Sequence, residues 1–432
     1  MNNSRPTFTS LLWLLLAVVS AASMAFYVFV IWSSNQPEHF SDLYAPWWGA
    51  HELLIHGRNP YSPAVAHEIQ TVIYGASATT FSPADPSGIA GGYAYPPFAA
   101  LLLGPTVYLP FPAVQRIFLG LSVLLALLSL SLWLRALRYR LRPVHWFTVA
   151  LFVMGSFPAL EAIKLQNLSL IAASLIAIAL FLLFADNLIL AGVFLAASTF
   201  KPQFTVVLIP WIALWTFADW RRRRALAWSF LGTLLLLVLV SEWLVPGWIW
   251  DFMNVVRAYR HYTYGHSLFD VWLTPTWGTI ASGVLLLLVL VGCWPHRSLP
   301  ADSSRFLLVA SLMLAANVVV IPTLAPHAQL LLWPGYLCLL RDRGLLWRSG
   351  PSARLLLFAV CTLVAWPWIS AFALLIAAIA YPVTSLLRFW EIPLYTSPLL
   401  PFAVSVALAC LLLAGTGSAG RDDLEANPLL PT

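Results

Sequence analysis

A single aspartate after the first long apolar block is a candidate general base. Asp42 stands between an apolar block that ends at Trp32 and a segment in which Leu43, Trp47 and Leu54 recur at helical spacing. A carboxylate placed there can accept a proton from an incoming hydroxyl group. It can equally cap the helix that the spacing predicts, because aspartate is a favoured N-cap residue. The two roles are compatible, and the sequence leaves both open.

The lysines give a second indication of chemistry. The chain has only two, and each begins a short motif that ends in glutamine: Lys164-Leu165-Gln166 and Lys201-Pro202-Gln203. An ammonium group at the bilayer centre costs roughly 2.5 kcal/mol or more, so a lysine near hydrocarbon either pairs with an anion or extends to the surface. A lipid phosphate would be such an anion, and simple extension to the surface is the alternative.

Further basic side chains follow in the second half of the chain. Arg257 and Arg260 are three residues apart, so on a helix they share a face and can grip one phosphate together. His261 and His266 follow them, and His327 comes after two prolines that would end a helix. A solvated loop and a satisfied interfacial histidine are the plainer interpretations.

The elements that position these residues must be membrane helices. Of 432 residues, 60% are hydrophobic and 9% are charged, whereas an ordinary soluble domain carries about 25% charged residues. The apolar residues form blocks of about 20, the length of a helix that crosses the bilayer. We therefore predict an all-α, polytopic transmembrane bundle of about twelve spans. Short amphipathic helices on the membrane surface are expected in the first outward loop, with Gly57 ending the first of them.

Positive charge sets the orientation, because Lys- and Arg-rich loops stay in the cytoplasm. Four arginine clusters mark that side: 135–142, 221–224, 297–305 and 341–354. Loops 33–95 and 245–275 then face outward. The net charge of +6 is explained by topology and does not indicate nucleic acid.

The predicted map is one domain over 1–414 with a polar, disordered cytoplasmic tail at 415–432. The first block is too long for a cleaved signal peptide and is predicted to remain as a span. Residues 97–134 are expected to cross once, after a short, partly inserted helix. The other predicted spans are 145–160, 166–184, 187–200, 203–219, 225–244, 276–294, 305–321, 328–340, 355–379 and 398–414.

Together these motifs resemble glycosyltransferase family 87, the polyprenyl-phosphate-mannose-dependent enzymes of the GT-C superfamily. The resemblance covers roughly residues 1–340 and depends on the order of six short motifs. They are Asp42/Tyr44, Gly57/Asn59/Pro60/Tyr61, Tyr95/Pro96/Pro97, Gln166/Asn167/Leu168, Lys201/Pro202/Gln203 and His327. A Gly-Arg-Asn-Pro at Gly57 replaces the family's more usual Gly-x-Asp-Pro, and the stretch 76–92 is unusually rich in Ser and Pro.

The resemblance implies inverting transfer of a sugar, mannose or a relative, from a polyprenyl-phosphate donor to a lipid-linked or cell-envelope glycan. The reaction would occur on the non-cytoplasmic face of the inner (plasma) membrane, without a metal or any other cofactor. Asp42 would be the base, and the donor phosphate would be held by Lys201, His327, Arg257, Arg260 and Lys164. The expected substrate contacts are Tyr44, Glu52, Asn59, Tyr61, Tyr95, Gln166, Gln203, His261 and His266.

Two other function classes compete with this interpretation. A lipid or solute transporter would place ionisable groups near the midplane of broken helices, whereas here they gather at one interface. A non-catalytic partner in an envelope complex would not need Asp42. A cleft that joins Asp42, Lys201 and His327 would favour the enzyme.

Overall fold

Helices form almost all of the chain in the computed structural model. It describes residues 8–33, 41–75, 91–262, 266–321, 325–386, 389 and 399–416, and these ranges contain no strand. Most of the expected tail, residues 417–432, and most of the Ser/Pro-rich stretch lie outside the described residues.

The first half of the chain builds the site and its supports. Its elements are α1 (Phe8–Ser33), α2 (Tyr44–His56), α3 (Pro63–Tyr74), α4 (Ala99–Leu103), η2 (Gly104–Thr106), α5 (Phe111–Ala136), α6 (Pro143–Met154), α7 (Phe157–Lys164), α8 (Ser169–Phe184), α9 (Leu188–Ala197), η3 (Ser198–Phe200), η4 (Pro202–Phe204) and α10 (Leu208–Ala218). The segment after Pro97 thus holds one short helix, the 3₁₀ turn η2 and one long helix, α5, which begins directly after Pro110.

The second half completes the bundle. Its elements are α11 (Trp220–Leu244), α12 (Trp248–Tyr262), α13 (Leu268–Trp272), α14 (Pro275–Cys293), η5 (Trp294–His296), α15 (Ser304–Val320), η6 (Pro326–Leu332), α16 (Trp333–Arg348), α17 (Pro351–Ala380), α18 (Val383–Leu386) and α20 (Leu399–Thr416). The span predicted at 328–340 is displaced, because its first residues form the 3₁₀ turn η6 and the helix runs on to Arg348.

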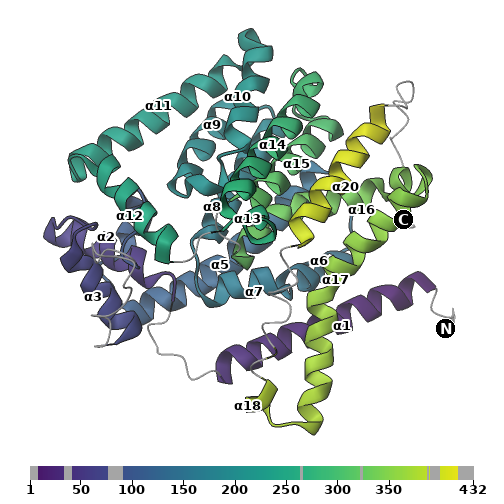
Figure 1. The fold of residues 1–432 in the computed structure, drawn as a ribbon, viewed down its shortest axis with the longest axis horizontal. Coiled ribbons are helices and arrows are strands. Elements are labelled where there is room, and N and C mark those ends of the chain that lie inside the picture. Colours follow the sequence, from purple (N-terminus) through teal and green to yellow (C-terminus); the bar gives the residue numbers. More distant parts are fainter. Residues whose placement is uncertain are drawn as a thin grey trace.

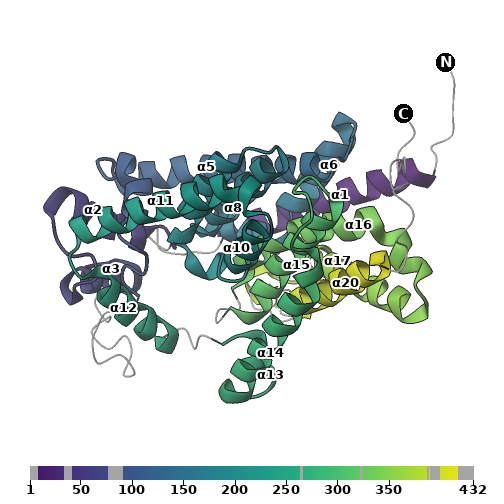
Figure 2. The same cartoon turned by 90° about the horizontal axis from the view of Figure 1, so that it is seen from above.

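The centre of the molecule is a group of packed helices around α15. Every residue of α15 from Phe306 to Val319 is buried, and the helix contacts α16, α20 and η6. Helices α2, α3 and α12 lie together at one end of the molecule, in both Figure 1 and Figure 2. The first and second loops of the sequence therefore meet at the same end.

The outer helices face a non-aqueous solvent. Helix α11 exposes large apolar side chains such as Trp228, Leu235 and Trp243, and α14 exposes Leu287 and Leu288. Exposed apolar faces of this size mark contact with lipid. Within the ranges that the structure describes, three helices are long and apolar enough to cross a membrane, and five spans result if two bent pairs, one of them α6 with α7, each count as one. Six shorter apolar helices of 10–17 residues accompany them.

Helix α2 corrects one expectation. It ends at Gly57 as predicted, with φ 64 and the Gly57 N–H bonded to the carbonyl of Leu53. Its apolar face does not lie on a membrane surface, however, because Leu43, Trp47 and Ala50 are buried against the protein. The helix packs on α3 and α4, so it is part of the core that supports the site.

A glycine allows α9 and α11 to approach closely, as small residues do in membrane helix pairs. A Cβ atom at Gly192 would lie 2.7 Å from the carbonyl oxygen of Leu226 on α11. Gly192→Val should therefore destabilise the protein by roughly 1–3 kcal/mol, the usual cost of overpacking. Thermal unfolding in detergent measures the effect. Gly232→Val, on α11 where no atom lies within 4 Å of the added Cβ, is the matched control, and equal losses in both variants would contradict the prediction.

Candidate active site

A strained turn between α7 and α8 organises the site. Ser156 caps α7 by accepting a bond from the N–H of Ala159, and the chain then turns through Gln166, whose φ is 51. This left-handed conformation is uncommon for a residue with a side chain, and the surrounding structure must hold it in place. Gln166 is anchored through its amide N–H₂, which donates to the carbonyl of Gln115 at 2.8 Å.

The same turn holds the segment that carries Asp42. The Asp42 N–H donates to the carbonyl of Leu165 at 2.9 Å. The Ser41 hydroxyl donates to the same carbonyl at 3.1 Å and lies 2.9 Å from the side-chain oxygen of Gln166. Residues 124 positions apart are thereby fixed to each other.

Asp42 does not cap α2. Leu43 is the N-cap residue of that helix and its first turn has no side-chain cap, so the capping interpretation is wrong. The Asp42 carboxylate instead accepts a hydrogen bond of 2.5 Å from the side-chain amide of Asn167. Asp42 is solvent-exposed by surface area, yet protein atoms surround it on most sides. The side chain is therefore partly enclosed by protein but open to solvent, and we call this partly enclosed position the recess.

Asn167 connects Asp42 to Lys201. While its N–H₂ group faces Asp42, its side-chain oxygen accepts from the Lys201 ammonium at 2.8 Å. Ser169 fixes this orientation, because its N–H donates to the same oxygen at 2.8 Å and its hydroxyl also contacts the ammonium. Lys201 is buried between η3 and η4, so it does not extend to the surface as the alternative interpretation required.

Burial shifts both charged groups toward neutrality. It raises the pKa of Asp42, while the hydrogen bond from Asn167 and the charge of Lys201 act in the opposite direction. Burial also lowers the pKa of Lys201, and the negative charge of Asp42 partly offsets this effect. The charges of Asp42 and Lys201 thus each favour the charged form of the other group, with the side chain of Asn167 between them.

A second polar pair, Glu161 and His327, belongs to the same site. Oε2 of Glu161 on α7 lies 3.9 Å from Nδ1 of His327 on η6. The charge of Asp42 acts on Glu161, and the charge of Lys201 acts on His327. Burial lowers the pKa of His327, so its imidazole is neutral at pH 7.

Sequence reasoning missed Glu161 and gave Asn167 no role of its own. Glu161 is an acid within an apolar helix, three residues before Lys164, and an ionisable residue in such a place is a functional candidate by default. That signal was available in the sequence. The bridging role of Asn167 was not, because it depends on two residues brought in from other parts of the chain.

The expected aromatic contacts support the recess from within the protein. The Tyr61 hydroxyl donates to the carbonyl of Tyr95 at 2.5 Å, and the Tyr95 ring stacks near Phe200, next to Lys201. Tyr44 is buried against Phe111. Tyr44 and Tyr61 are thus core residues and not members of a membrane-interface belt.

The remaining candidates are divided between the site and the second loop. Gln203 offers its backbone carbonyl to Asn317 at 2.8 Å. On α12, Asp251 accepts from the amide of Asn59 at 2.9 Å, and Arg257 is exposed and bonded to Asn254. Lys164, at the end of α7, and His266, before α13, are half-buried, while the side chains of Arg260 and His261 lie outside the described residues.

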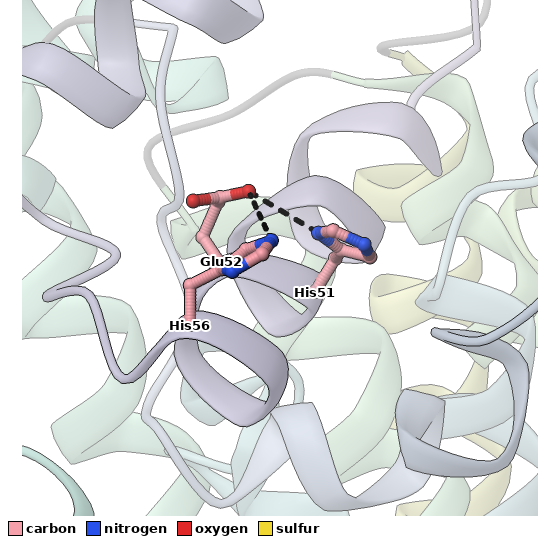
Figure 3. A group of neighbouring side chains, drawn as sticks. All are labelled: His51, Glu52 and His56. Carbon is pink, nitrogen blue, oxygen red and sulfur yellow. Dashed lines mark hydrogen bonds and ion pairs between the residues drawn. The ribbon is translucent and has the colours of Figure 1, made fainter.

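Glu52 lies in a separate cluster on α2, drawn in Figure 3. Its Oε1 faces His51 at 3.2 Å and His56 at 3.9 Å, while its Oε2 bonds to Arg58 at 2.5 Å. The side chains of His51, Glu52 and His56 have the spacing of a possible metal site. Arg58 already neutralises the carboxylate, however, so the cluster is complete as an ion-pair network.

Comparison with known proteins gives one match. The sequence model of glycosyltransferase family 87 matches residues 93–326, just over half of the 432-residue chain. No curated protein matches the chain, and no solved structure does. The matched range includes Glu161, Asn167 and Lys201 and stops one residue before His327, whereas Asp42 precedes it.

The bond between Asn59 and Asp251 predicts that the first and second loops lie on the same side of the membrane. Thr71→Cys on α3 and Asn254→Cys on α12, both exposed positions, should react equally with an impermeant thiol reagent added to whole cells. Arg348→Cys at the end of α16 is the control for the opposite side. Cys361 and Cys410 are first replaced by serine to remove background labelling. Labelling at only one of the two loop positions would contradict a shared site.

Proposed function

The chain belongs to glycosyltransferase family 87, and from this premise we propose that it transfers mannose from a polyprenyl-phosphate donor to a lipid-linked or cell-envelope glycan, with inversion at the sugar. The reaction takes place on the non-cytoplasmic face of the inner membrane. That the protein is a membrane glycosyltransferase follows from its family and its apolar helices. The donor, the sugar, the acceptor and the twelve-span topology are part of the proposal.

One observation supports this function best: a carboxylate and an ammonium group held on opposite ends of one amide. An inverting transfer needs a base on one side of the sugar and positive charge at the leaving group on the other. Asp42 and Lys201 supply these two groups, and Asn167 keeps them apart by bonding to both.

The proposed step moves one proton and exchanges one bond. The acceptor hydroxyl oxygen attacks the anomeric carbon while Asp42 accepts its proton. The bond from that carbon to the phosphate oxygen breaks, and its electron pair stays on the polyprenyl phosphate. A phosphate leaving group needs no general acid, because Lys201 can stabilise its charge directly.

The other phosphate candidates remain proposals of unequal strength. Lys164 is half-buried at the end of α7, close to the turn that carries Asn167, so it is a suitable second cation. Arg257 and Arg260 lie on α12, whose Asp251 bonds to Asn59 of the first loop, and Arg257 is exposed. His327 is the weakest, because burial lowers its pKa and a neutral imidazole offers a phosphate no positive charge.

A transporter is less well supported. Its ionisable groups should line a path at the midplane of broken helices. The chain belongs instead to a family of glycosyltransferases, and in the described residues Asp42, Asn167 and Lys201 form one hydrogen-bonded group in the connections between helices. Such a placement suits a substrate whose lipid tail stays in the membrane while its head group reaches the recess.

Asp42→Asn should lower transfer by about 10²–10⁴-fold, the usual contribution of a general base, because the amide keeps the shape of the side chain but cannot accept the proton. Transfer is measured with purified protein, labelled polyprenyl-phosphate-mannose and total membrane lipids. Donor binding should change little. Glu68→Gln on α3, a carboxylate outside the recess, is the control, and activity of Asp42→Asn near that of the control would remove Asp42 as the base.

Asn167→Ala should move the acidic limb of the activity profile to higher pH. Asp42 acts as a base only when ionised, and the bond from Asn167 stabilises the ionised form. Losing that bond raises the pKa of Asp42, so activity is lost at a higher pH as the solution is acidified. The pH dependence of kcat/KM measures the shift. Ser169→Ala removes a neighbouring contact of Lys201 but keeps the donor to Asp42, so it should leave the limb in place.

A further inference from the structure

Two buried polar atoms face each other in the site without a hydrogen-bond partner. Oε2 of Glu161 and Nδ1 of His327 are both shielded from solvent and unpaired in the described part of the chain. Their separation of 3.9 Å is too long for a direct hydrogen bond. Most buried polar atoms in proteins are paired, so two unpaired atoms that face each other need an explanation.

The spacing suits one small group between the two side chains. An oxygen atom placed beside two atoms 3.9 Å apart can lie within about 2.8 Å of both. The pair is held firmly for this purpose, because α7 packs against η6 and the backbone N–H of His327 bonds to the Glu161 carboxyl group. An oxygen that enters between the two side chains would therefore bond to both atoms.

The chemistry of the pair selects the kind of oxygen. A carboxyl group accepts hydrogen bonds when ionised and can also donate one when protonated, and a neutral imidazole nitrogen either donates or accepts. A hydroxyl both donates and accepts, so it can bond to the two side chains at once in any of these states. The unesterified oxygens of an ionised phosphodiester can only accept.

The position of the pair identifies which hydroxyl it meets. Glu161 interacts electrostatically with Asp42, and His327 interacts with Lys201. The pair is thus close enough to the base and the ammonium group to interact with both. In the proposed reaction, the transferred sugar lies between those two groups, since its anomeric carbon lies between the acceptor hydroxyl and the leaving phosphate.

We propose that Glu161 and His327 form a recognition site for one ring hydroxyl of the transferred sugar, and so determine which sugar the enzyme accepts. This inference depends on the proposed function, because it requires a sugar donor in the recess. It gives His327 a role in sugar recognition in place of the phosphate contact expected from the sequence.

The test compares donors that lack single hydroxyl groups. Polyprenyl-phosphate-mannose and its 2-, 3-, 4- and 6-deoxy analogues are assayed by kcat/KM with the wild-type protein, Glu161→Gln, Glu161→Ala and His327→Ala. With the wild-type protein, kcat/KM for one of the deoxy donors should be roughly 10–100-fold below that for the mannose donor, because the missing hydroxyl leaves the buried pair without a partner. With Glu161→Ala and His327→Ala, kcat/KM for the same deoxy donor should be less than about threefold below that for the mannose donor, since these variants have already lost the contact with the hydroxyl.

Each other result has a distinct meaning. If the wild type transfers no sugar from any polyprenyl-phosphate donor, the proposed function fails. If the wild type transfers mannose but every variant keeps the full discrimination, only the hydroxyl site is overturned.

Thermal unfolding is measured alongside, and Glu161→Gln, which keeps the size of the side chain, serves where Glu161→Ala does not fold. A loss of stability with unchanged discrimination would mean that a water bridges the pair, which also overturns the proposal. Glu68→Ala is the control carboxylate and should leave the discrimination as in the wild type.

Discussion

The Asn167 side chain is the contact on which the rest of the site depends. An amide has a donor and an acceptor at fixed positions, so it can bind a carboxylate at one end and an ammonium group at the other. A direct ion pair would hold the two charges against each other, whereas the amide separates them and leaves room for a substrate. Its orientation is set by Ser169 and by the strained turn at Gln166. The backbone strain at Gln166 and the buried charge of Lys201 are tolerated because the packed helices on both sides hold this turn in one conformation.

The bundle supports that turn from several directions. Asp42 is fixed through its backbone to Leu165, and α2 is fixed through its buried face to α3 and α4. Lys201 lies between the two short 3₁₀ turns that follow α9, where Pro202 prevents a continuous helix. The three polar groups thus come from connections between helices, and the helices themselves supply rigidity. In this arrangement the polar groups lie in connections between helices, while the apolar faces of α11 and α14 are exposed for contact with lipid.

Burial gives the site its electrostatic character. A low dielectric strengthens each interaction between charges and raises the cost of leaving any of them unpaired. Asp42 and Lys201 meet this cost through Asn167, while Oε2 of Glu161 and Nδ1 of His327 have no hydrogen-bond partner in the described part of the chain. Under the proposed function, the hydroxyl and phosphate groups of the donor would interact with both sets of side chains.

The sequence by itself determined the class of the molecule, because apolar blocks of about 20 residues with few charges can only be membrane helices. Helix ends were predictable to within a few residues wherever prolines or Gly57 mark them, as at α5, α14 and α2. Asp42 and Lys201 could be singled out because a charge beside an apolar block has to be explained. The tertiary structure alone decided that Asp42 does not cap α2, that α2 is buried, and that Glu161 faces His327. These facts depend on contacts between different helices, 59 positions apart for Trp47 and Thr106 and 125 for Asp42 and Asn167, and local spacing carries no information about such contacts.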